Sequence, residues 1–173
     1  VYADPLKGFL GALDFFRRTT KFDISRMPRI STYWSAINYA FVVSGRIPVK
    51  ICKRLLEASK RFVDAHDIRD RLGTIISNNI ICVVQGEWEN LEDLDEDFFT
   101  ACLRIGEFIL TLFTLRRYGL TKVEQGEFAG PKKEIDRLDL IGRTYGQETA
   151  TLLTSELKAF LLVAKGFAEE AVE

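Results

Sequence analysis

Apolar residues recur every three or four positions along almost the whole chain, and this helical periodicity constrains the fold more than any other feature. Residues with that spacing share one face of a helix, so each stripe predicts an amphipathic helix that buries one side. No strand pattern competes with these stripes, and we therefore expect an all-α protein. The predicted helices span residues 4–18, 31–44, 49–63, 67–84, 97–118, 131–141 and 147–165.

Helix start and stop signals divide the chain in the same way. Asp4 and Pro5 suit the N-cap and the first turn of the first helix. Segment 97–118 has the longest apolar pattern, and the acidic run before it suits a helix N-terminus. It ends at Gly119, a residue typical of a helix C-terminus. We therefore expect 97–118 to be one long helix at the centre of the core.

The size and composition of the chain indicate one compact body with an added N-terminal helix. Its 173 residues, 47% of them apolar, suffice for a single hydrophobic core. We expect residues 1–30 to form a helical extension and residues 31–173 to form the main domain. The chain begins with Val1 rather than methionine, which fits a processed precursor or a trimmed N-terminus.

Charge and hydropathy argue against two classes of partner. Lys+Arg 24 against Asp+Glu 25 leaves a formal net charge of -1, which provides no field for holding nucleic acid. Glu107 interrupts one long apolar run, and Asn78 and Asn79 interrupt the other, so neither reaches the roughly 18 to 20 residues of a membrane span. We expect a soluble or peripheral protein without a transmembrane segment.

The usual enzyme constellations lack their main parts. His66 is the only histidine, which excludes a two-histidine zinc site and argues against a Ser-His-Asp triad. The acidic run over residues 87–97 lacks the spacing and internal glycine of a calcium-binding loop, and we interpret it as a solvated helix start. We expect no enzymatic activity and no metal site.

Three cysteines, an odd number, lie within helical patterns and predict free thiols rather than disulfides. Cys82 is interpreted as a small core residue and Cys52 as a partly exposed one. Cys102 is followed two positions later by Arg104, and a nearby cation favours the reactive thiolate. Two interpretations stay open: an ordinary buried thiol beside an arginine, or an anchor for a covalently held prosthetic group.

Three segments together resemble the phycobiliprotein family, the allophycocyanin and phycocyanin subunits of light-harvesting phycobilisomes. "INYAFVVSGRIPVKICKRLL" is similar to two N-terminal helices of that family, "CLRIGEFILTLFTLRRYG" to its chromophore-attachment helix, and "VEQGEFAG" to the turn that follows. The resemblance covers about residues 31 to 166. It implies a globin-like helical fold preceded by two helices that dock onto a partner subunit.

Carried over residue by residue, the resemblance implies that Cys102 forms a thioether to an open-chain tetrapyrrole, a bilin, and that Arg104 pairs with a propionate. Ile105 stands where the family has an aspartate that hydrogen-bonds the pyrrole nitrogens. An aliphatic side chain cannot do this, so the bilin is either bound differently or absent. The resemblance therefore implies a divergent subunit, acting as a structural linker or as a bilin-carrying energy-transfer subunit.

The same resemblance implies that the chain assembles with other phycobiliprotein or photosynthetic-complex subunits in a hetero-oligomer. Its location would be the thylakoid surface, in the chloroplast stroma or the cyanobacterial cytoplasm. The alternative is an unrelated all-helical adaptor or assembly scaffold without a prosthetic group. That alternative predicts an exposed apolar face on the first helix, from Leu6 to Phe16.

Overall fold

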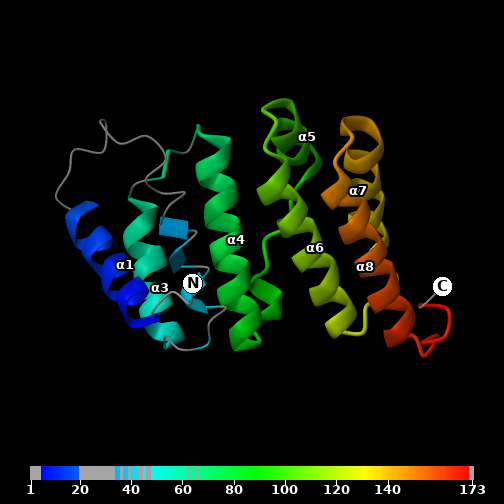
Figure 1. Cartoon of the computed structure of the whole chain (residues 1–173), viewed down its shortest axis with the longest axis horizontal. Helices are drawn as coiled ribbons and strands as arrows, with labels where there is room; N and C mark the ends of the chain where they lie inside the picture. Colours follow the sequence, from blue (N-terminus) through cyan, green and yellow to red (C-terminus); the bar gives the residue numbers. More distant parts are fainter. Residues whose placement is uncertain are drawn as a thin grey trace. The chain divides into compact units, whose positions relative to one another are not determined.

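Within its described residues the protein is all-helical, as the periodicity predicted, and contains no strand. None of the described helices is long and apolar enough to cross a membrane. The chain divides into two compact units, Val1–Glu92 and Asp93–Glu173 (Figure 1). The computed structural model describes residues 5–19, 34–35, 37–38, 40–42, 45, 48–61, 63–64 and 66–171.

The Val1–Glu92 unit is organised around two helices that pack against each other, α3 and α4. Asp67 caps α4 by accepting a hydrogen bond from the Arg69 backbone N–H at 2.8 Å, and Gly86 ends it with a left-handed φ of 70°. The predicted break between the helices over residues 49–63 and 67–84 is therefore confirmed. The elements of this unit are α1 (Pro5–Thr19), α3 (Val49–Lys60), α4 (Ile68–Gln85) and the 3-10 helix η2 (Trp88–Asn90).

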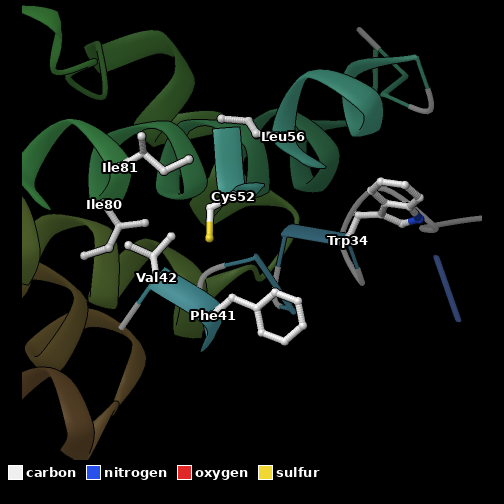
Figure 2. Packing of buried hydrophobic residues seen from close by; sticks show 7 residues of the cluster. All are labelled: Trp34, Phe41, Val42, Cys52, Leu56, Ile80 and Ile81. Atoms are coloured by element: carbon white, nitrogen blue, oxygen red, sulfur yellow. The ribbon is translucent and has the colours of Figure 1, made fainter. Parts of the chain in front are cut away.

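Buried side chains from segment 34–42, α3 and α4 form the core of this unit (Figure 2). Figure 2 shows the sulfur of Cys52 pointing from α3 toward Val42 and Phe41. Ala12 and Phe15 of α1 pack against this cluster. The cluster consists of Trp34, Phe41, Val42, Cys52, Leu56, Ile80 and Ile81.

The buried stripe of α3 differs from the predicted one. The apolar spacing of residues 49–63 favours a stripe of Ile51, Leu55, Ala58 and Phe62, of which Phe62 lies outside the described residues. The buried residues are instead Cys52, Leu56 and Ser59, and Leu55 and Ala58 are partly buried against the core cluster. The expectation that Cys52 is partly exposed was wrong, because its side chain is 0% exposed. Apolar residues occur on both adjacent stripes of this helix, so tertiary packing decided which one faces the core.

The predicted extension, residues 1–30, contains α1, and the structure places α1 within the larger Val1–Glu92 unit. The division that the structure shows falls between Glu92 and Asp93. Asp4 and the residues around position 30 lie outside the described residues, as do the side chains of Leu6, Phe9 and Phe16.

The Asp93–Glu173 unit contains three helices that pack on one another in all pairs, α6, α7 and α8, with α5 packed on α6. Helices α6 and α8 run in the same direction (Figure 1). Helix α7, which lies between them in the sequence, runs antiparallel to both. The elements are α5 (Glu96–Arg104), α6 (Phe108–Glu124), α7 (Lys132–Tyr145) and α8 (Glu148–Ala164). The last two lie close to where the sequence predicted them.

The prediction of one long helix over 97–118 was wrong, because the chain breaks at Gly106. Gly106 has a φ of 72°, and its N–H donates to the Leu103 carbonyl at 3.0 Å. The next N–H, of Glu107, donates to the Cys102 carbonyl at 3.0 Å. These two bonds around a left-handed glycine are the Schellman ending of a helix. In the sequence, apolar residues continue at helical spacing on both sides of Gly106, so the pattern predicted an unbroken helix.

Gly119 was expected to end this helix, but it lies buried inside α6. A Cβ built on Gly119 would come within 2.6 Å of Leu157 Cδ2 and 3.4 Å of Glu134 Cβ. Glycine is therefore present because α6 and α8 approach closely there, and not because the helix stops.

We expect stability to fall in the order Gly119, Gly119→Ala, Gly119→Val, with a loss of about 1–3 kcal/mol in the free energy of unfolding for valine. An added side chain must push Leu157, which is 0% exposed, out of its packed position. At an open helical site alanine would instead gain about 1 kcal/mol over glycine. Urea unfolding followed by circular dichroism measures the order, and a more stable alanine variant would contradict the close packing.

Candidate functional site

The two residues that the sequence singled out lie on different sides of α5. Cys102 is 0% exposed, whereas Arg104 is an exposed residue at the end of the same helix. Successive helical residues are about 100° apart around the axis, so side chains two positions apart point in nearly opposite directions. The structure therefore does not bring the Cys102 thiol and the Arg104 guanidinium together. Ile105 follows as the C-cap residue of α5.

Carboxylates from the acidic run hold the start of α5. Asp95 caps the helix by accepting a hydrogen bond from the Phe98 N–H at 2.7 Å. Glu96 accepts a hydrogen bond from Arg137 Nη2 of α7 at 2.5 Å. These contacts stabilise the N-terminus of α5. The sequence also placed these carboxylates at a helix start.

A shallow depression of about 440 Å³ lies beside this helix start, and Cys102 is not among its lining residues. Two of its cations are already paired, since Lys133 Nζ is 2.8 Å from Asp93 Oδ2 and Arg137 contacts Glu96. Its charges therefore largely balance. The lining residues are Glu96, Phe99, Lys132, Lys133, Asp136, Arg137 and Leu140.

A different surface of the same unit exposes several large apolar side chains on two packed helices. Residues of α6 at positions 109, 113 and 116 share one side of that helix, as do residues of α8 at positions 152, 156, 160 and 163. We call this surface the α6–α8 face. Its apolar members, with their exposed fractions, are Ile109 52%, Phe113 47%, Leu152 67%, Phe160 43% and Val163 53%.

An ion pair joins the two helices in the middle of the α6–α8 face. Arg116 of α6 donates two hydrogen bonds to the carboxylate of Glu156 of α8, one of them from Nε to Oε2 at 2.7 Å. This hydrogen bond lowers the pKa of Glu156 below its ordinary value of 4.5. The two-point contact fixes the relative rotation of α6 and α8, and hence which side chains share the face.

Sequence reasoning missed this face, because the apolar periodicity of residues 147–165 does not distinguish Leu152 and Phe160 from Leu153 and Leu157. The buried residues of α8 are Ala150, Leu153, Thr154 and Leu157. A signal was present: residues 159–164 are apolar without interruption, so a single buried stripe must leave some of them exposed.

We expect the Glu156 pKa to return toward its ordinary value in an Arg116→Met variant. A carboxyl group whose folded pKa is depressed adds stability above its unfolded pKa, and that stability is lost as the pH falls through the folded pKa. The contact between α6 and α8 should therefore weaken as the pH falls below about 4.5. This pH-dependent weakening should be smaller in the Arg116→Met variant. Carboxyl NMR titration measures the pKa directly, and equal values in both proteins would contradict the ion pair.

The apolar face predicted on the first helix is partly present. Leu10 is 54% and Leu13 37% exposed, whereas Ala12 and Phe15 pack against the core cluster of the Val1–Glu92 unit. The described part of α1 therefore divides its apolar residues between the core and solvent. It exposes fewer large apolar residues than the α6–α8 face does.

Comparisons of the chain with protein-family models, with curated proteins and with solved structures found no match. Over the described residues, the fold defines an all-helical protein.

Proposed function

We propose that the protein is a non-catalytic helical assembly subunit that docks through its α6–α8 face and carries no bilin at Cys102. The observation that supports docking is the face itself, where five large apolar side chains are between 43% and 67% exposed around one ion pair. Several large exposed apolar side chains gathered on one side of two packed helices are typical of protein interaction sites. This corresponds to the adaptor or scaffold alternative raised by the sequence.

The burial of Cys102 is the reason for leaving out the bilin. Thioether formation requires a sulfur at the wall of a pocket that admits the tetrapyrrole, and Cys102 is 0% exposed. Arg104, the residue expected to pair with a propionate, lies on the other side of α5. Ile105 offers no hydrogen bond to the pyrrole nitrogens. A bilin at Cys102 would therefore require the packing around this thiol to open.

The light-harvesting role, the phycobilisome partners, the thylakoid location and the globin-like order of helices depend on the family resemblance alone. They remain predictions, and the docking proposal does not require them.

Absorption and thiol chemistry test the absence of a bilin. We expect the purified chain to have no visible absorbance and no zinc-induced fluorescence on a denaturing gel. Iodoacetamide should label its three cysteines only after denaturation, because all three are buried, and burial raises the pKa of Cys52 and Cys82. Colour that stays with the denatured chain and disappears in a Cys102→Ala variant would contradict this part of the proposal.

Site-specific photo-cross-linking tests the docking role. A benzoylphenylalanine placed at Leu152 or Phe113 should cross-link to a protein partner in the cell of origin. The matched control is Leu140 of α7, which is 49% exposed in the same unit but lies outside the α6–α8 face. Cross-linking that is absent at Leu152 and Phe113, or equally strong at Leu140, would rule out this face as the docking surface.

A further inference from the structure

The α6–α8 face is complementary to itself, and we propose that two copies of the chain pair through it in a two-fold symmetric dimer. This inference rests on the proposed docking role of the face and names its occupant.

The charges at the centre of the face are complementary under a two-fold rotation. Arg116 and Glu156 carry opposite charges and lie side by side on α6 and α8. A two-fold axis that lies in the interface, passes between them and runs parallel to the helices places Arg116 of one copy opposite Glu156 of the partner copy, and the reverse. Each charge then faces an opposite one in both copies. A strongly acidic or strongly basic partner finds no such match on a neutral face.

The apolar residues are arranged in a way that suits the same rotation. On their helices, Ile109, Phe113 and Leu152 precede the ion pair, while Phe160 and Val163 follow it. Because α6 and α8 run in the same direction, the first group lies toward one end of the face and the second toward the other (Figure 1). The rotation keeps the helices of the two copies parallel and places α6 of each copy opposite α8 of its partner. It therefore sets Ile109 and Phe113 of each copy opposite Leu152 of the partner copy.

The area of the face is sufficient for a stable pair. A standard interface removes about 800 Å² from each partner, somewhat more than half of it apolar. Five large side chains that are about half exposed supply roughly 500 Å² of apolar surface, taking about 200 Å² for a fully exposed side chain of this size. Exposed polar residues beside these side chains, such as Ser155, contribute to a polar rim.

Analytical ultracentrifugation of the full chain gives the first test. We expect a reversible monomer–dimer equilibrium at micromolar concentration. Leu152→Glu or Phe113→Glu should raise the dissociation constant at least about tenfold, because each dimer would then bury two unpaired carboxylates. Leu140→Glu, at a matched exposure on α7, should leave it unchanged. A wild-type chain that stays monomeric throughout, or a dimer unaffected by both face variants, would overturn the proposal.

Charge reversal gives a second test that depends on the partner being another copy. An Arg116→Glu chain places two glutamates at the centre of its face, and a Glu156→Arg chain places two arginines there. Each variant alone should be monomeric, since like charges would meet across the axis. An equimolar mixture should form a mixed dimer, because every glutamate then faces an arginine. Circular dichroism checks that both variants keep their helices, and a mixture that stays monomeric would overturn the proposed symmetry.

The two proposals fail in different ways. Cross-links from Leu152 to a different polypeptide, together with a monomeric wild-type chain, would retain the docking role and reject the second copy. A dimer in solution without cross-links at the face would reject both the docking role and this dimer geometry.

Discussion

Replacing Lys122 with methionine should lower the free energy of unfolding by about 3–5 kcal/mol. Lys122 Nζ lies 3.1 Å from Oε1 of Glu134, whose side chain is 0% exposed, and 4.5 Å from the centre of the Tyr118 ring. The other oxygen of Glu134, Oε2, has no hydrogen-bond partner among the described residues. Without the lysine, a carboxylate would be left buried between α6 and α7 with no counter-ion, and this accounts for the size of the loss.

A double variant separates the loss of the pair from the loss of the lysine stem. Lys122→Met combined with Glu134→Leu removes both charges and fills the space with apolar atoms, so most of the stability should return. Lys158→Met, on the exposed side of α8, provides a matched control with an expected change within about 0.5 kcal/mol. Denaturant unfolding measures all four proteins. A double variant as unstable as Lys122→Met would show that the buried charge is not the cause.

The second large effect is expected at Arg137, where methionine should cost about 2–4 kcal/mol. The Arg137 side chain is 6% exposed, and Nη1 donates to the Leu94 carbonyl at 2.8 Å, just before α5. Its guanidinium also lies 4.6 Å from the centre of the Phe99 ring. Methionine keeps most of the stem but leaves the carbonyl unpaired and removes the cation–π contact. The partner Glu96 is 71% exposed, so its own loss adds little.

Arg143 in the same helix is the matched control for Arg137. It pairs with Asp139 at 2.8 Å, but its side chain is 79% exposed. Arg143→Met should therefore change the free energy of unfolding by less than about 0.5 kcal/mol. Hydrogen exchange should also show faster opening of α5 in Arg137→Met, because Arg137 joins the start of α5 to α7. Equal losses at both arginines would contradict this role.

The proposed function changes how Cys102 and Arg104 are interpreted. The question raised by the sequence was whether this pair is a prosthetic-group anchor or a buried thiol next to an arginine. Full burial of Cys102 and the exposure of Arg104 favour the second interpretation. In that interpretation Cys102 helps to pack α5 in the Asp93–Glu173 unit. The thiol labelling and absorption experiments distinguish the two directly.

Local chemistry in the sequence was enough to predict the class of fold and most helix ends. Asp67 and Asp95 accept backbone hydrogen bonds as N-caps, and Gly86 adopts the left-handed conformation that ends a helix. Such signals act within one turn, so they can be recognised without knowing what the helix packs against. The all-α prediction itself depended on the apolar periodicity.

The role of each glycine and the choice of buried stripe required the tertiary structure. Gly106 and Gly119 look alike in the sequence, yet one ends α5 with a positive φ and the other lies inside α6 against Leu157. Likewise, α8 is apolar on several sides, and only its packing against α6 and α7 leaves Leu152 and Phe160 exposed. Periodicity determines that a helix has an apolar side. Which side is buried depends on the neighbouring helices, and so the α6–α8 face emerged only from the three-dimensional structure.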